Sequence, residues 1–166
     1  SPGILQIGLG AALSSAFNMH LKWPNDIVDG GYRKCGGVLS ELLSGGSVRT
    51  GIGMNRYGQQ IPGVETTGWD ASLPTMAKTT ATCVADAAVA SALDAHPLIG
   101  NPNSENLRKS AWKEISEVLS RGHVAIVNGA CKRTVAIGEN GEILLAGDSD
   151  IISISEVGGI SWKVTT

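Results

Sequence analysis

The sequence predicts an α/β (α+β) protein in which a mixed, mostly antiparallel sheet is backed by helices and followed by a small β-barrel. Three observations support this fold class. Apolar residues at helical spacing open the chain, glycine-rich turns then separate apolar runs of strand length, and beyond residue 121 only short apolar runs remain. Because these patterns occupy separate stretches, we expect a core over residues 1–120 and a barrel over residues 121–166.

The first predicted elements are a buried helix and a strand. From Leu5 to Phe17 a large apolar side chain recurs at every fourth position, so these side chains would line one face of a helix. Residues 19–23 alternate between apolar and polar side chains, which predicts a strand. Pro24 would end this strand, because proline lacks the N–H that a sheet needs and has a fixed φ.

A β-hairpin and a long loop come next. The runs 35–43 and 48–54 are predicted to be two strands joined by a turn at Ser44-Gly45-Gly46. Residues 55–73 contain Gly, Pro, Thr and Gln without periodicity, which indicates a loop. Loops of this length in compact domains are usually functional or mobile.

Two helices and a set of short strands complete the chain. Pro74 opens an alanine-rich helix that runs to about residue 95, and a second helix follows over residues 104–119 after a polar break at 100–103. Asn-Gly and Gly-Gly turns then separate five short apolar runs, which predicts a small barrel. These runs are residues 124–127, 134–137, 143–145, 151–154 and 160–164.

Composition excludes several classes of protein. The formal net charge is -2 and no run of Lys and Arg makes a basic surface, so nucleic acid is not an expected partner. The longest apolar stretch, residues 4–17, is shorter than the roughly 20 residues that a membrane helix needs. Three widely spaced cysteines indicate neither a disulfide framework nor a metal site. We therefore expect a cytoplasmic protein with reduced thiols.

The residues suited to chemistry gather in two short stretches. Lys22, Asn25 and Asp26 belong to the stretch KWPND, and Lys34 opens the stretch KCGGV eight residues after Asp26. Lys22 lies on the predicted strand, whereas Asn25 and Asp26 lie in the loop that follows it. Lys34 begins the next strand. Two ammonium groups, one carboxylate and one amide would therefore converge at one end of the sheet.

This mixture of groups suits phosphate chemistry. Lysine places a positive charge on phosphate oxygens, Asp26 can hold Mg²⁺, and Gly36 and Gly37 let a ligand approach the backbone closely. Activation of an acid by ATP needs these parts. The alternative is that residues 24–26 form a turn chosen for its backbone geometry and that both lysines are solvated surface charges.

Three segments carry a resemblance to a known family. LKWPNDIV, RKCGGVLSEL and TGIGMN resemble the central signature of biotin protein ligases in order and approximate spacing. A helix that contains Trp112, followed by short strands, also resembles the C-terminal layout of that family, which ends in an SH3-like barrel. The Trp-Pro pair of KWPND favours biotin protein ligases over the related lipoate ligases. The resemblance implies the class II synthetase-like core that biotin and lipoate ligases share.

The resemblance also implies roles for individual residues. Lys22 would neutralise phosphate charge as biotin attacks the α-phosphate of ATP, and Lys34 would hold the biotin carboxylate or the phosphate of biotinyl-5′-AMP. Gly36 and Gly37 match the stretch whose backbone contacts the biotin ring. Asn55 matches an asparagine that helps to bind ATP or its Mg²⁺.

The implied reaction has two steps. Biotin and ATP give biotinyl-5′-AMP and pyrophosphate, and a lysine of a biotin carboxyl carrier protein or carboxylase domain then attacks the adenylate. Asn25 and Asp26 would shape the site, with Asp26 as the candidate contact for Mg²⁺ or for the acceptor lysine. Neither step needs a nucleophile of the enzyme, so Cys35 is expected to be a small buried apolar residue.

One part of the family pattern has no counterpart in the sequence. No segment resembles the Gly/Arg-rich, GRGRR-like loop that lies upstream of KWPND in biotin protein ligases, so we expect the first part of a catalytic domain to be absent. A fragment, a split enzyme that needs a second chain and a homologue without catalysis all fit, and an unpaired sheet edge would favour a homodimer. A non-catalytic biotin- or adenylate-binding or regulatory module and a lipoate–protein ligase remain alternatives.

Overall fold

The computed structural model describes residues 2–95, 104–148, 150–155 and 157–164. Within these ranges the chain forms an α+β fold whose sheets are antiparallel, as the sequence predicts. None of the helices in these ranges is long and apolar enough to cross a membrane. The predicted polar break at residues 100–103 lies outside the described part of the chain.

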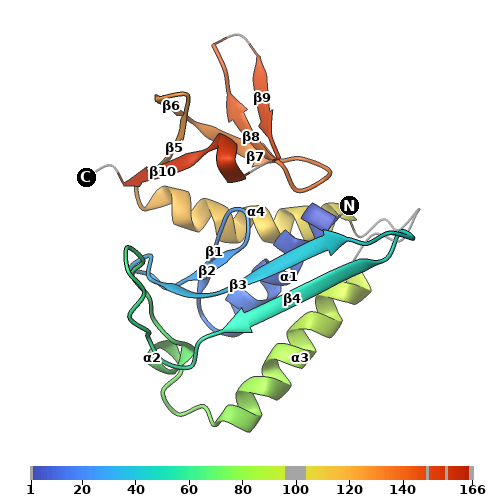
Figure 1. Ribbon diagram of the computed structural model, residues 1–166, viewed down its shortest axis with the longest axis vertical. Helices are drawn as coiled ribbons and strands as arrows, with labels where there is room; N and C mark the ends of the chain where they lie inside the picture. Colours follow the sequence, from blue (N-terminus) through green and yellow to red (C-terminus); the bar gives the residue numbers. More distant parts are fainter. Residues whose placement is uncertain (1, 96–103, 149, 156, 165–166) are drawn as a thin grey trace.

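A four-stranded sheet and its helices form the first part of the molecule (Figure 1). The strand order is β1-β2-β3-β4, and α1 packs against β3, α3 and α4. In Figure 1, α4 lies between this sheet and the C-terminal strands. The elements are α1 (Pro2–Ala16), β1 (His20–Lys22), β2 (Asp26–Val28), β3 (Lys34–Leu42), β4 (Val48–Met54), α2 (Trp69–Ser72), α3 (Lys78–Ala95) and α4 (Ser104–Ser120).

Two glycines let α1 pack closely against its neighbours. The apolar stripe predicted for this helix is buried, which confirms its core-facing side. A Cβ on Gly8 would lie 2.7 Å from Leu107 of α4, and a Cβ on Gly10 would lie 2.7 Å from Leu21 of β1. Both distances are shorter than a normal carbon contact, so glycine provides a close approach that offsets its low helix propensity.

The strand β2 corrects the sequence interpretation. The sequence predicts that Asn25 and Asp26 lie in a loop, but only Asn25 lies in the turn, because Asp26 opens β2 and pairs with Lys22 of β1. A strand of three residues has too little alternation to be recognised from periodicity. The pairing makes the side chains of Lys22 and Asp26 cross-strand neighbours on one face of the sheet.

The predicted hairpin is confirmed as β3 and β4, and the predicted helix over residues 104–119 is confirmed as α4. The loop over residues 55–73 contains the short helix α2, and α3 begins at Lys78 rather than at Pro74. Trp69 of α2 is buried, with its ring centroid 6.2 Å from that of Phe17. This contact fixes a separate helical turn ahead of α3.

The C-terminal segment forms two three-stranded sheets, with the orders β10-β5-β6 and β7-β8-β9. Its strands include the five predicted ones and the unpredicted β6, which has only three residues. Closure into a barrel requires every strand to pair on both edges. In the described residues four strands are edges, so the predicted SH3-like barrel is not confirmed. The strands are β5 (His123–Val127), β6 (Ala130–Lys132), β7 (Thr134–Ile137), β8 (Ile143–Ala146), β9 (Ile151–Ile154) and β10 (Ser161–Val164).

Two clusters of buried side chains hold the layers together, and α1 contributes to both. Ile4 and Ile7 pack with α4 and with the C-terminal sheets, whereas Leu9 and Leu13 pack with α3 and β3. The first cluster contains buried residues of β5, β7 and β8, so the C-terminal sheets share a core with the helices. The predicted boundary near residue 121 falls between α4 and β5, and the division into two domains stays a prediction.

Candidate functional site

The two faces of the β3–β4 hairpin differ. Val38 of β3 is buried against the helices, and it pairs with Ile52 of β4. Because side chains alternate along a strand, the residues on either side of this pair face away from the helices. These outward residues are Gly37 and Leu39 on β3, paired with Gly53 and Gly51 on β4.

The outward face of the hairpin is therefore a strip of exposed backbone, which we call the glycine strip and define as Gly37, Gly51 and Gly53. A Cβ on Gly51 or Gly53 would meet no atom within 4 Å. A Cβ on Gly37 would lie 3.8 Å from Oδ1 of Asp26 and 3.9 Å from Cε of Lys34. The strip thus ends beside two of the predicted charged residues.

Gly36 has a different role from Gly37. A Cβ on Gly36 would lie 2.2 Å from the carbonyl oxygen of Gly53 and 2.9 Å from Sδ of Met54. The absence of a side chain at Gly36 is needed for strand packing, whatever contacts a ligand makes there.

The carboxylate of Asp26 lies between the two predicted lysines. Its Oδ2 is 4.0 Å from Nζ of Lys22, and its Oδ1 forms an ion pair with Nζ of Lys34. The side chains of Lys22, Asp26 and Lys34 are 30%, 23% and 42% exposed. Pairs this exposed contribute less than about 1 kcal/mol to stability, so the cluster matters more for the net positive charge it presents beside the glycine strip.

The backbone of Lys34 is fixed by the loop that follows β4. The N–H of Lys34 donates to the carbonyl of Glu65 at 2.8 Å, and the carbonyl of Lys34 accepts from the N–H of Thr67 at 2.9 Å. On the other side of β3, the carbonyl of Asn25 accepts from the N–H of Val38 at 3.0 Å. These contacts set the position of the Lys34 side chain, and Asn25 acts here through its backbone.

Asn55 lies just beyond the end of β4, one strand away from the charged cluster. Its N–H donates to the carbonyl of Cys35 at 2.7 Å, and its carbonyl accepts from the N–H of Trp69 at 3.0 Å. Its side-chain Oδ1 lies 3.5 Å from Nε2 of Gln59. The structure therefore brings Lys22, Asp26 and Lys34 together and leaves the Asn55 side chain bonded to its own loop.

The loop between β2 and β3 is held in shape by Asp29. Oδ1 of this buried carboxylate accepts from the N–H groups of Gly31 and Arg33 at 2.9 Å, and Oδ2 accepts from Nε of Arg33 at 2.8 Å. Burial alone would raise the pKa of Asp29, but the hydrogen bonds from Arg33 and Gly31 outweigh it and lower the pKa. These hydrogen bonds hold the loop immediately before Lys34.

The same loop is clamped by the C-terminal segment. Tyr32 stacks on His123 of β5 with ring centroids 3.1 Å apart, and its hydroxyl donates to the carbonyl of Val118 in α4. Arg121 donates to the carbonyl of Gly30 at 2.8 Å and to Nε2 of His20 at 3.0 Å. We call this set of contacts the C-terminal clamp, defined by Tyr32, His123 and Arg121.

Charge and burial both act on His123. Burial, and then the positive charge of nearby Lys22, lower the pKa of His123 to about 4, so the ring is neutral near pH 7. No pattern in the sequence indicates a role for Tyr32, His123 or Arg121. Their partners are about 90 residues away in the chain, and no spacing rule connects positions that far apart.

Trp23 gives the motif KWPND a second link to the C-terminal sheets. Its Nε1 donates to the carbonyl of Gly141 at 2.9 Å in a buried contact. Gly141 has a φ of +90°, and a Cβ there would lie 2.5 Å from the backbone of Gly3. Trp23 is therefore a core residue that also fixes the turn before β8.

Cys35 is buried as predicted, with no exposed surface. Burial raises the pKa of its thiol to about 11, so a thiolate is scarce near neutral pH. The described residues include no group of three or more His, Cys, Asp or Glu side chains that could hold a metal ion.

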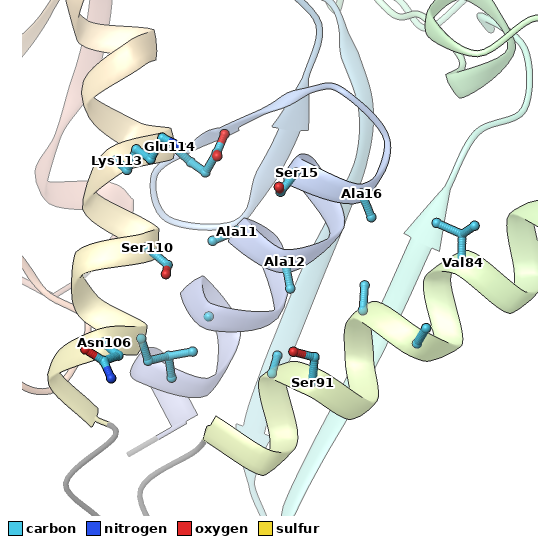
Figure 2. Close-up of a pocket in the computed structure, with 15 residues that line it drawn as sticks. Ala11, Ala12, Ser15, Ala16, Val84, Ser91, Asn106, Ser110, Lys113 and Glu114 are labelled. Carbon is cyan, nitrogen blue, oxygen red and sulfur yellow. The ribbon is translucent and has the colours of Figure 1, made fainter.

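A cavity of about 590 Å³ lies elsewhere, between α1, α3 and α4. Figure 2 shows Ala12 and Ala16 of α1 and Val84 and Ser91 of α3 on its walls, with Glu114 of α4 on the other side. Burial raises the pKa of the Glu114 carboxyl. Small side chains dominate this lining, and the charged cluster and the glycine strip do not contribute to it.

No protein-family model matches the sequence, and no curated protein matches it. Among solved structures, the chain is similar to apo biotin protein ligase from Aquifex aeolicus, with a TM-score of 0.73 and 21% identity over 98% of this chain and 76% of that one. The same Aquifex enzyme in complex with biotin and ATP gives a TM-score of 0.70 and 22% identity over 98% and 72% of the two chains. The biotin protein ligase of Leishmania major in complex with biotinyl-5-AMP gives 0.51 and 19% over 93% and 70%. The chain therefore has the fold of biotin protein ligases.

Proposed function

We propose that this chain is a biotin protein ligase that activates biotin with ATP and transfers it to a lysine of a carrier protein. The observation that carries the proposal is the position of Lys22, Asp26 and Lys34 at one end of the glycine strip. It is supported by the fold, which is that of a ligase whose structure was solved with biotin and ATP.

The first step joins two anions, and the positive charges of the lysines would reduce the repulsion between them. A carboxylate oxygen of biotin forms a bond to the α-phosphorus of ATP, and the bond from that phosphorus to the bridging oxygen breaks as pyrophosphate leaves. Negative charge accumulates on the phosphate oxygens during this step. Lys22 and Lys34 would stabilise that charge, because positive groups beside the reacting phosphate favour the transition state.

Asp26 would position these lysines. Its carboxylate holds both ammonium groups within reach of one ligand, since like charges brought this close would otherwise repel each other. Both carboxylate oxygens already face ammonium groups, which favours this role over the predicted contact with Mg²⁺. A Mg²⁺ ion carried by ATP takes many of its ligands from phosphate oxygens and water.

The glycine strip would receive the bicyclic ring of biotin. Exposed backbone allows a ligand to lie closer than any side chain would permit. Leu39, which is 64% exposed on the same face, would provide an apolar wall. The valerate carboxylate would then extend toward Lys34, which borders the strip at Gly37.

The second step transfers the acyl group. The amine of the acceptor lysine attacks the carbonyl carbon of biotinyl-5′-AMP, the bond to the phosphate oxygen breaks, and AMP leaves with the electron pair while the amine loses a proton. No covalent intermediate with the enzyme is needed, which agrees with a buried and protonated Cys35. The partner would be a biotin carboxyl carrier protein or carboxylase domain, met in the cytoplasm, where free cysteines stay reduced.

The test is biotin-dependent exchange of pyrophosphate into ATP, which measures the first step alone. Lys34→Ala and Lys22→Ala should each lower the exchange rate by about 100-fold. Lys109→Ala is the matched control, because Lys109 is an exposed lysine paired with Glu105 on α4. Exchange that is equally fast in all three variants would contradict the assignment of the lysines.

The alternatives give different results in the same experiment. A non-catalytic biotin- or adenylate-binding module would show a biotin-dependent rise in melting temperature without exchange. A lipoate–protein ligase would show exchange with lipoate and not with biotin.

A further inference from the structure

The loop between β4 and α2 contains a tight turn whose ends are two apolar residues. The N–H of Val64 donates to the carbonyl of Ile61 at 3.1 Å, and the two residues pair as an antiparallel bridge. Pro62 and Gly63 lie between them, and Gly63 has a φ of +74°. Proline followed by a glycine with positive φ is typical of a type II turn. We call residues 61–64 the hairpin tip.

The base of the hairpin tip is tied to Lys34. The N–H of Gln59 donates to Oγ1 of Thr66 at 2.7 Å, and the Thr66 hydroxyl donates to the carbonyl of Gln59. Thr66 forms a parallel bridge with Lys34, whose N–H and carbonyl bond to the residues on either side of Thr66. Hydrogen bonds therefore hold the hairpin tip in a set position relative to Lys34.

The hairpin tip presents apolar surface to solvent. Ile61 is 45% exposed and Val64 is 43% exposed, and their side chains are cross-strand neighbours in the bridge. Both line a groove of about 710 Å³, to which Arg33 and Glu65 also contribute. An apolar centre with a polar rim is the arrangement found in protein interfaces. A turn that is already held in shape also loses little entropy when a partner binds.

The second reaction step indicates which partner this surface fits. The amine of the acceptor lysine must reach the acyl carbon of the adenylate, which is proposed to lie beside Lys34, so the carrier protein must contact the surface around Lys34. Of the described surfaces there, the glycine strip is assigned to biotin, and His123 of the C-terminal clamp is buried. The groove of the hairpin tip begins at Arg33, next to Lys34 in the chain, and is open to solvent.

We propose that the carrier protein docks on the hairpin tip while its lysine enters the site. The identity of this partner rests on the proposed ligase function. Ile61 and Val64 would pack against apolar side chains of the carrier, and Arg33 and Glu65 would pair with polar groups around them. Two apolar side chains make a small contact. Small interfaces are typical of transient encounters, which suits a partner that leaves after each transfer.

The test uses the full chain and a purified apo biotin carboxyl carrier domain. A double variant, Ile61→Ser with Val64→Ser, removes both apolar side chains from the hairpin tip. We expect the KM for the carrier in the transfer reaction to rise by about tenfold, with kcat at saturating carrier unchanged, because docking is weakened and the chemistry is not. Ile151→Ser is the matched control, since Ile151 is an isoleucine of β9 that is 56% exposed, and it should leave the KM unchanged.

Two further measurements separate this inference from the proposed function. Biotin-dependent pyrophosphate exchange does not involve the carrier, so the double variant should keep the wild-type rate. Titration calorimetry of the carrier domain into the chain without ATP needs no activity, and the double variant should bind about tenfold more weakly. Binding that depends on the hairpin tip, in a chain without exchange, would contradict the ligase function and support the docking surface.

Other results would overturn the docking surface. A KM and an affinity equal in the wild type and the double variant would mean that the carrier docks elsewhere. Loss of exchange in a double variant with an unchanged melting temperature would mean that the hairpin tip contacts the nucleotide. A wild-type dimer that the double variant dissociates, measured by analytical ultracentrifugation, would assign the hairpin tip to a second copy of the chain. A wild type that neither exchanges pyrophosphate nor binds the carrier would overturn both proposals.

Discussion

The two sides of the candidate site are built in opposite ways. On the sheet side, Lys22, Asp26 and Lys34 stay partly exposed beside a strip of bare backbone. On the C-terminal side, Tyr32 and His123 form a stack in which burial raises the pKa of the phenol and lowers that of the imidazole.

This difference assigns separate tasks to the two sides. Exposed ion pairs add little to stability and remain free to exchange partners with a charged ligand. Buried stacked rings contribute stability and hold the loop before Lys34 in place. Substitutions on the sheet side should therefore change activity without changing stability, and substitutions in the C-terminal clamp should change stability first.

The largest effect is expected from filling the glycine strip. Gly53→Val should lower biotin-dependent pyrophosphate exchange by about 100-fold, because a side chain would stand where the biotin ring is proposed to lie. The melting temperature should stay unchanged, since a Cβ on Gly53 meets no atom within 4 Å. Exchange and thermal unfolding measured on one preparation check both parts.

Gly36→Ala is the matched control for this prediction. Its Cβ would lie 2.2 Å from the carbonyl oxygen of Gly53, so this smaller substitution should destabilise the fold by about 2 kcal/mol. If Gly53→Val lowers stability as much as Gly36→Ala does, the strip is a packing feature and the proposed ring site is wrong.

The next effect concerns the C-terminal clamp. His123→Ala should lower the free energy of unfolding by about 2 kcal/mol, because it removes a stacked ring from a buried position. His123→Phe keeps a ring against Tyr32 and should lose much less. Urea denaturation measures both variants, and equal losses would show that stacking is not what holds the clamp together.

A smaller effect should appear in the pH dependence of stability. The pKa of His123 is about 4 in the folded chain, below the reference value of 6.5 that applies to the unfolded chain. Between these values the unfolded chain binds a proton that the folded chain does not, so the free energy of unfolding should fall as the pH drops from 6.5 to 4.

Other groups act in the same pH range, so the comparison needs a variant. The lowered pKa of His20 has the same sign, and the raised pKa of Glu114 has the opposite sign. The difference between the wild type and His123→Phe isolates His123, and it should shrink as the pH falls through this window. A difference that is constant with pH would contradict the lowered pKa of His123.

The same contrast explains what the sequence could predict. The charged cluster was predictable because Lys22, Asp26 and Lys34 lie within thirteen residues and their strands pair as neighbours. The glycine strip could have been found in full, since Gly51 and Gly53 alternate in TGIGM on a strand that pairs with Gly37.

The clamp and the pairing of the C-terminal strands into two sheets were beyond prediction for a physical reason. His123 and Tyr32 meet only because α4 packs against β1 and brings the start of β5 to the β2–β3 loop. Strands of three residues, such as β2 and β6, also carry no periodicity of their own. Their existence depends on pairing partners that a local pattern does not reveal.

The smallest effect tests the unpartnered hydroxyl of Thr134. In phosphate-free buffer, Thr134→Val should raise the free energy of unfolding by about 1 kcal/mol, because it replaces a buried hydroxyl without a hydrogen bond by a methyl group of similar size. Thr50→Val is the matched control, since the Thr50 hydroxyl lies 2.8 Å from that of Ser40. Loss of this hydrogen bond should lower the free energy of unfolding by about 1 kcal/mol. Opposite signs in urea denaturation would confirm that the two threonines differ in partners, and a loss of stability in both would mean that Thr134 already has a partner in solution.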